Sequence, residues 1–166
     1  MTTTVTTEPR STAVAMADYV NPVLSATRSV FEMMLDCIPT RTGLGLKDEN
    51  SPDYEVSSVI GISGRMRGTL ILGLSSAVAC EVLRRMVGTQ TDQVNNEVCD
   101  AVGELTNMIA GAAKAQLARF ELSLSLPNVV TGSGHRLHFP SEIRPFIISY
   151  QSDLGPFIIE VAFHEI

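Results

Sequence analysis

Residues 55–74, EVSSVIGISGRMRGTLILGL, contain two apolar segments separated by a glycine-bounded turn. The segments Glu55–Ser63 and Thr69–Leu74 are rich in Val, Ile and Leu, as strands of a buried sheet are. The residues between them, Gly64–Gly68, are typical of a hairpin loop. This stretch therefore predicts an antiparallel pair of strands near the middle of the chain.

A second stretch has a similar order of residues. A glycine precedes an apolar strand both in GTLILGL (68–74) and in GPFIIEV (155–161), and the chain is predicted to end in a hairpin made by Pro145–Ser152 and Pro156–His164. A helix precedes each hairpin, which suggests a duplicated helix-plus-hairpin unit, although two unrelated short hairpins would give the same pattern. Helices beside neighbouring hairpins indicate an α+β domain with a largely antiparallel sheet.

Three helices are predicted from apolar periodicity and from capping residues. They are a first helix that begins at Asn21-Pro22 and includes Ile38, a second that Ser75 or Ser76 caps and Gly88 ends, and a longest one that runs from the cap Asn96 to Arg119. Residues 40–53 are expected to form a loop. Residues 1–17 are expected to be a flexible tail, which leaves a single domain over residues 18–166.

The composition and charge of the chain disfavour several classes of function. The chain has 166 residues, enough for one domain, and a formal net charge of −6 with its basic residues scattered, which disfavours a general binder of nucleic acids or anionic membranes. The N-terminus lacks the basic start and apolar segment of a signal peptide, so we expect a cytoplasmic protein. The three cysteines form no C-x-x-C pair, which favours reduced thiols over a disulfide or a thiolate metal site.

A metal site at His135 and His138, with Glu142 as a third ligand, is the alternative to ordinary loop and strand-end histidines. On a strand, residues three apart point to opposite faces. The ordinary interpretation is therefore preferred, and no metal site is predicted.

The longest predicted helix has two different sides when its residues are placed 100° apart. One side is apolar and is expected to face the core, and it consists of Val98, Val102, Leu105, Ile109 and Ala112, with Ala113, Gln116 and Phe120 near its edges. The other side begins acidic, continues with an amide and ends with small residues, in the order Glu97, Asp100, Glu104, Asn107, Met108, Gly111 and Ala115.

Gly111 needs a reason, because glycine inside a helix costs about 1 kcal/mol relative to alanine. It would let another surface approach the helix closely beside Glu104 and Asn107, which project from positions one turn apart. Alternatively, the helix side is solvated and the glycine packs on the protein's own sheet. The residues by themselves favour this second explanation.

The run DAVGELTNMIAGAAK (100–114) resembles the active-site helix of the CheX branch of the CheC/CheX/FliY chemotaxis phosphatases, whose mark is E-x-x-N followed by small residues and Gly-Ala-Lys. Four further segments match in the same order, namely NPVLSATRSVFEMM (21–34), VIGISGRMRGTLILGL (59–74), SLPNVVTGSG (125–134) and LGPFIIEV (154–161). The resemblance implies a CheC-like fold, with an antiparallel sheet, a long active-site helix and two further helices.

The resemblance also implies a phosphatase that dephosphorylates the aspartyl phosphate of a CheY-like response regulator. Carried over by position, Glu104 would pair with a lysine of the receiver and Asn107 would orient the attacking water. Met108, Gly111 and Lys114 would form the partner-facing helix surface, although a solvated surface lysine is the more ordinary interpretation of Lys114.

No cofactor of its own is expected, since the receiver would carry the Mg²⁺ ion. A homodimer is implied as well. The alternative is a receiver-binding or flagellar-switch-like adaptor that docks without turnover.

Overall fold

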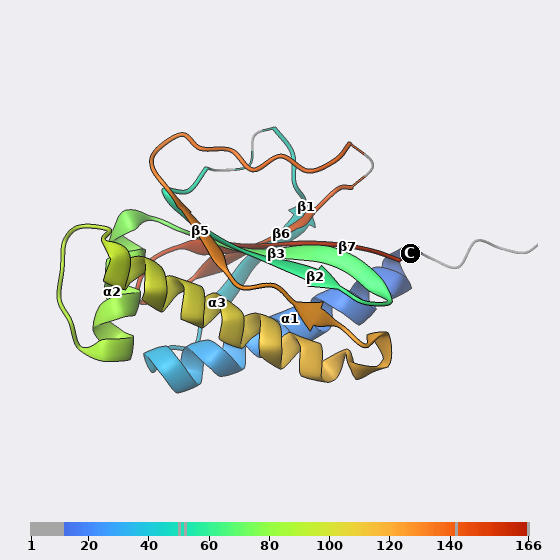
Figure 1. Ribbon diagram of the computed structural model, residues 1–166, viewed down its shortest axis with the longest axis horizontal. Helices are drawn as coiled ribbons and strands as arrows, with labels where there is room; N and C mark the ends of the chain where they lie inside the picture. The colour runs from blue at the N-terminus through green and yellow to red at the C-terminus, as the bar shows by residue number, and fades with distance from the viewer. Residues whose placement is uncertain (1–11, 50, 52, 142, 166) are drawn as a thin grey trace, which may run out of the picture.

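The computed structural model describes residues 12–49, 51, 53–141 and 143–165. Its elements follow the chain in the order α1 (Thr12–Leu35), β1 (Thr40–Leu46), β2 (Val56–Ser63), β3 (Met66–Leu74), α2 (Ser76–Val87), α3 (Asn96–Gln116), the 3₁₀ turn η1 (Ala118–Phe120), β4 (Ser123–Leu124), β5 (Asn128–Thr131), β6 (Phe146–Gln151) and β7 (Phe157–Glu165). The expected α+β class, with three α-helices beside an antiparallel sheet, is confirmed (Figure 1).

The sheet has the order β1-β6-β7-β3-β2-β4, and β5 also pairs with β2. The two predicted hairpins, β2–β3 and β6–β7, lie side by side because β3 pairs antiparallel with β7. The strand before each hairpin then pairs with the other hairpin, β1 with β6 and β5 with β2. This reciprocal arrangement is the one that a duplicated unit would produce.

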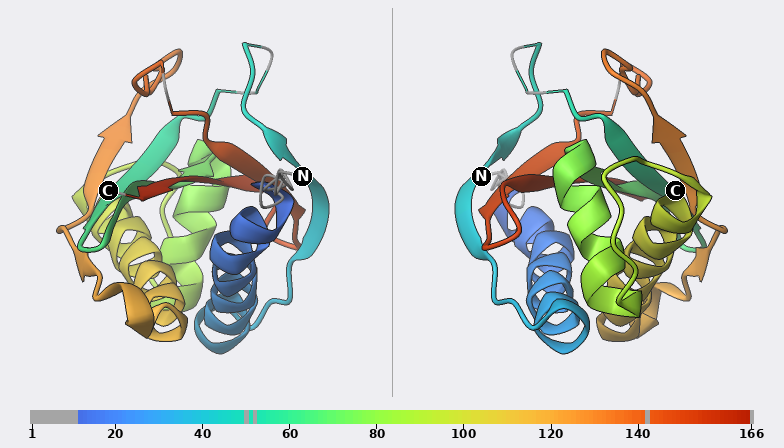
Figure 2. Two further views of the ribbon diagram at one scale, coloured as in Figure 1. Left: turned by 90° about the vertical axis from the view of Figure 1, so that its right-hand side faces the viewer. Right: turned by 90° about the vertical axis from the view of Figure 1, so that its left-hand side faces the viewer.

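All three helices cover one face of the sheet, whereas the loops after β1 and β5 rise on the other face (Figure 2). The core lies between the helices and the sheet. At its centre, the ring of Phe31 on α1 stacks on Phe157 of β7 with centroids 4.5 Å apart, and Tyr150 of β6 stacks on the same ring at 4.8 Å. Among the described residues, no helix is both long and apolar enough to cross a lipid bilayer.

The predicted start of the first helix is wrong, because α1 begins at Thr12 and passes through Pro22. Proline lacks the N–H that would bond within the helix, so it was interpreted as a helix start. Burial of Val20 and Val23, on either side of Pro22, offsets the missing hydrogen bond. Residues 12–17 of the predicted tail are thus helical, residues 1–11 lie outside the described residues, and the helix ends at Leu35, before Ile38.

Two further predictions are corrected in the sheet. Residues 40–46, expected as loop, form the edge strand β1, whose side chains are mostly exposed and whose two glycines are also typical of turns. Only Gly64 and Arg65 form the turn between β2 and β3, since β3 begins at Met66. Gly68 therefore lies inside β3 and not in the turn. A glycine is needed at this position because a Cβ there would overlap the carbonyl oxygen of Ala162 on β7.

The predicted bounds of α2 are confirmed. The Ser75 hydroxyl accepts a hydrogen bond from the backbone N–H of Val78 at 3.2 Å, and Gly88 ends the helix in the left-handed region with φ +81°. Two predicted limits of α3 move slightly. Its N-cap is Asn95 rather than Asn96, and the helix ends at Gln116 before the separate turn η1.

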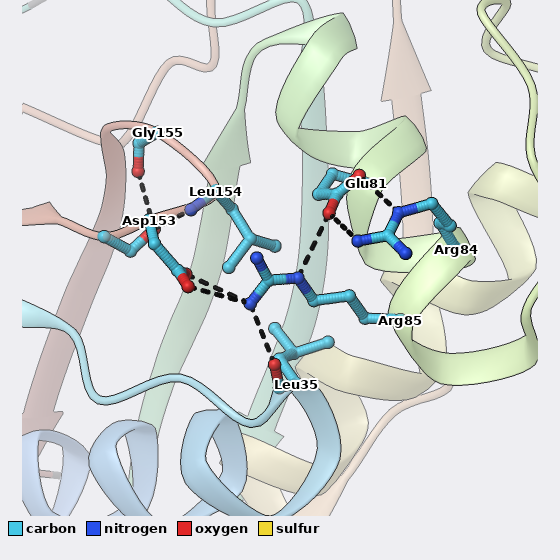
Figure 3. Close-up of polar contacts among 8 residues, drawn as sticks. Leu35, Glu81, Arg84, Arg85, Asp153, Leu154 and Gly155 are labelled. Atoms are coloured by element: carbon cyan, nitrogen blue, oxygen red, sulfur yellow. Dashed lines mark hydrogen bonds and ion pairs between the residues drawn. The ribbon is translucent and has the colours of Figure 1, made fainter.

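Arg85 on α2 joins three segments of the chain (Figure 3). One guanidinium nitrogen, Nη1, donates to the carbonyl oxygen of Leu35 at the end of α1 and to Asp153 Oδ1 in the β6–β7 turn, both at 3.0 Å. Its Nε donates to Glu81 at 3.1 Å. The hydrogen bond from Arg84, with a smaller contribution from Arg85, lowers the pKa of the Glu81 carboxyl to about 2 from its ordinary value of 4.5.

The substitution Glu81→Gln tests this network. Because the pKa of Glu81 is lower in the folded chain, its carboxylate stabilises the fold above about pH 4.5, and this contribution is lost as the pH falls toward 2. We expect the variant to lose about 1 kcal/mol of unfolding free energy at pH 7, after allowance for solvent screening. The difference from the parent chain should shrink below about pH 4.5 and vanish only near pH 2. Urea unfolding between pH 7 and 2 measures both.

The matched control is Glu32→Gln, because Glu32 is exposed on α1 and has no ion pair with any described residue. A pH-independent difference between the Glu81 variant and the parent chain would contradict the assignment.

Candidate functional site

The long helix α3 presents its predicted apolar side to the core. Val98, Val102, Leu105 and Ile109 are each 0% exposed, which confirms the assignment of this side. Ala112 is half-buried and Ala113 is buried, so the buried stripe is slightly rotated from the predicted one. Gln116 is exposed, although the next residue, Leu117, is buried in the core.

The start of α3 is fixed by Asn95, whose Oδ1 accepts a hydrogen bond from the backbone N–H of Val98 at 3.0 Å. Glu97 lies in the first turn and Lys114 in the last, where each charge is favourable to the helix dipole. A capped helix with a fully buried stripe is rigid. The residues in its middle are therefore held in defined positions.

Glu104 and Asn107 lie in that middle part, and both side chains are exposed. They are three positions apart and so project from the same side of the helix. Neither side chain has a hydrogen bond or an ion pair with any described residue. Their carboxylate and amide groups are therefore available to another molecule.

An open groove adjoins Asn107 along the C-terminal half of α3. Its volume is about 510 Å³, and it is lined by Asn107, Gly111, Lys114, Ala115 and Ala118 on one side and by Glu121, Leu122 and Leu124 on the other. A Cβ placed on Gly111 would have no atom of another described segment within 4 Å. The favoured explanation that this glycine packs on the sheet is therefore wrong, and Gly111 instead faces the open space of the groove.

Of the residues predicted for the partner-facing surface, Gly111 and Lys114 line this groove together with Asn107. Met108 does not line it, because its side chain is half-buried and packs against the core. Glu104 projects one turn before the groove. The structure thus brings together an amide, an ammonium group and a glycine, with the carboxylate at one end.

The second wall of the groove, Glu121–Leu124, was not found from the sequence. Glu121 has a left-handed backbone with φ 49°, and its carboxylate accepts a hydrogen bond from Arg65 Nε at 3.0 Å. Leu124 belongs to β4 and pairs with Ile62 of β2. No local pattern signals this wall, because it depends on contacts between segments some sixty residues apart in the chain.

The structure also shows where the possible metal ligands lie. Among the residues that the structure describes, no group of three or more His, Cys, Asp or Glu side chains is placed to bind an ion. His135 lies within hydrogen-bond distance of Ser57, with Nε2 at 2.8 Å from Oγ, and its Nδ1 donates to the carbonyl oxygen of Gly132 at 2.6 Å. Glu142, the alternative third ligand, lies outside the described residues.

The chain is similar to known proteins both in the sequence of α3 and in its fold. The family model described as chemotaxis phosphatase CheX matches residues 56–151, which include the whole of α3 and the groove. The CheY-P phosphatase CheX of Thermotoga maritima is 34% identical over 82 residues. That alignment covers 48% of this chain and 53% of the relative, so the chain spans about half the length of the Thermotoga protein.

Solved structures match over more of the chain. The chemotaxis protein CheX from Vibrio vulnificus is 32% identical with a TM-score of 0.82, covering 89% of this chain and 100% of that one. The CheX–CheY–BeF₃–Mg²⁺ complex from Borrelia burgdorferi is 24% identical with a TM-score of 0.75, covering 89% of this chain and 98% of that one, a likeness that shows the fold alone. By its sequence and its structure, this chain belongs to the chemotaxis phosphatase CheX family.

Proposed function

We propose that the protein is a phosphatase that hydrolyses the aspartyl phosphate of a CheY-like response regulator. The observation that carries this proposal is the pair Glu104 and Asn107, which are exposed on a rigid helix beside an open groove and have no hydrogen bond or ion pair with any described residue. Family membership supports it, as do the relatives described as a CheY-P phosphatase and as a complex with CheY. The active site would be assembled from two proteins.

The reaction suits the residues that the helix presents. A water oxygen forms a bond to phosphorus, and the bond from phosphorus to the aspartyl oxygen breaks. The aspartate leaves as a carboxylate with an ordinary pKa near 4, so no acid is needed to protonate the leaving group. The rate then depends mainly on the alignment of water and on charge compensation, for which a Mg²⁺ ion and a lysine of the receiver are expected.

Asn107 would align the water. Its amide oxygen accepts a hydrogen bond from a water molecule while its amide nitrogen donates one, and the group carries no charge that would repel the phosphoryl oxygens. Because α3 is capped at Asn95 and buried along its apolar stripe, Asn107 would enter the receiver's pocket with little loss of conformational freedom.

Glu104 would dock the receiver by pairing with one of its lysines. The side chain is exposed and pairs with no residue in the described part of the chain, so no ion pair seen there must break on docking. Glu97 and Asp100 extend the same acidic side toward the start of the helix, which would steer a basic receiver rim. The formal net charge of −6 would likewise attract a basic receiver surface.

We also propose that the protein acts in the cytoplasm, where CheY-like receivers would be met, and that its functional form is a homodimer. The edge strand β1 supports pairing, because it exposes Leu44 and Leu46 by 48% and 46%. Sedimentation of the full chain would test the stoichiometry.

Asn107→Ala tests the catalytic assignment. We expect the variant to lose about 100-fold or more of the acceleration of phosphate release from a phosphorylated CheY-like receiver, since its water would no longer be aligned. Affinity for the receiver should change little. Phosphate release is followed with a phosphate sensor, and Gln116→Ala serves as a control because Gln116 is also exposed on α3. Undiminished turnover in Asn107→Ala would contradict the assignment of Asn107, whereas binding without any turnover by the parent chain would favour an adaptor.

Glu104→Gln tests the docking assignment. Removing the charge while keeping the shape should raise the KM for the phosphorylated receiver about two- to fivefold and leave kcat nearly unchanged. The dependence of KM on salt should also become weaker, because one ion pair fewer is screened. The matched control is Glu32→Gln on α1. An equal effect of both substitutions would point to general steering rather than to a specific pair.

Gly111→Ala separates stability from function. A methyl group at this position meets no neighbouring segment among the described residues, so the unfolding free energy should rise by about 0.5–1 kcal/mol. If the receiver approaches the helix closely there, its affinity should fall in the same variant. Thermal unfolding and receiver titration measure the two effects, and a stabilised variant with unchanged affinity would place the receiver away from Gly111.

A further inference from the structure

Leu126 is the most exposed large apolar side chain among the described residues, at 86%. It lies in the short connection between β4 and β5. An exposed leucine in isolation is common in proteins and needs no explanation. The position of this one beside α3 gives it a different meaning.

The connection runs along α3 in the opposite direction to the helix (Figure 1). Leu124, two residues before Leu126, lines the groove together with Asn107. Pro127, the residue after it, lies against Gly103, where a Cβ would stand 3.4 Å from the proline Cγ. Because Gly103 and Asn107 are one turn apart, Leu126 flanks the turn of α3 that carries Glu104 and Asn107.

The backbone around Leu126 is held in place on both sides. The N–H of Ser125 donates to the carbonyl oxygen of Gly61 at 2.9 Å, and the Ser125 hydroxyl accepts from the N–H of Gly61 at 2.8 Å. The same hydroxyl donates to the carbonyl oxygen of Leu126 at 3.0 Å. Pro127 restricts the backbone of the residue before it. The exposed side chain is thus presented by a fixed loop.

We infer that Leu126, continued by Leu124, is an apolar contact for the receiver, where it packs against an apolar side chain on the rim of the receiver's phosphorylated pocket. This inference rests on the proposed function. It follows from continuity, since the groove that begins at Asn107 has Leu124 in its wall and Leu126 at its margin.

The energetics of docking also require such a contact. An exposed ion pair such as the one proposed for Glu104 contributes little affinity, whereas the centre of a protein interface depends on buried apolar anchors. The leucine would therefore act mainly on receiver affinity, and Asn107 on the chemical step.

The test uses the full chain and a CheY-like receiver from the same cell, loaded with beryllofluoride and Mg²⁺ for binding and phosphorylated for turnover. Leu126→Ser is expected to weaken binding about tenfold, with KM raised to match and kcat changed less than twofold. Its melting temperature should stay close to that of the parent chain, because the side chain is exposed. The control Met33→Ser removes a side chain that is 68% exposed on α1, beneath the other half of the sheet (Figure 2).

Equal receiver affinity of the Leu126 and Met33 variants would overturn the inference. It would also be overturned if Leu126→Ser changed the oligomeric state and left receiver affinity unaltered, since a second copy of the chain would then cover the leucine. If the parent chain bound the receiver without releasing phosphate, the proposed function would fail while the loss of affinity in Leu126→Ser would still support the contact. A parent chain that bound no receiver would refute both.

Discussion

Burial of one stripe of α3 is the constraint on which the site depends. Val98, Val102, Leu105 and Ile109 are completely removed from solvent between α1 and the sheet. A helix turns by about 100° per residue, so fixing this stripe also fixes the direction of every other side chain on it. Glu104 and Asn107 are thereby directed into solvent, and no rotation of the helix could turn them inward without exposing the core.

The sheet contributes the other half of the surface. Pairing of β4 with β2 brings Leu124 alongside the helix, and the ion pair between Arg65 and Glu121 joins the β2–β3 turn to the start of that segment. Gly103 allows Pro127 to approach the helix closely, whereas Gly111 leaves space open. Two glycines on one helix thus serve opposite purposes, close packing within the chain and room for a partner.

A site of this kind needs few groups of its own. In the proposed reaction the receiver supplies the phosphoryl group, the leaving carboxylate and the metal ion, and this chain supplies one amide, one carboxylate and a shaped surface. Rigidity is then the main requirement, because the helix must place Asn107 with sufficient accuracy in a pocket formed by another protein. The N-cap at Asn95 and the buried stripe meet that requirement within α3 itself.

The two sides of α3, the bounds of α2 and the two hairpins were determined by the sequence alone, because helical and strand periodicity and capping residues act over a few neighbouring positions. The start of α1 through Pro22, the edge strand β1 and the groove wall Glu121–Leu124 were decided only by the tertiary structure. Each of these is stabilised by contacts with distant segments. A local pattern carries no record of such contacts, so the buried and exposed sides of α3 were predictable and the surface around the helix was not.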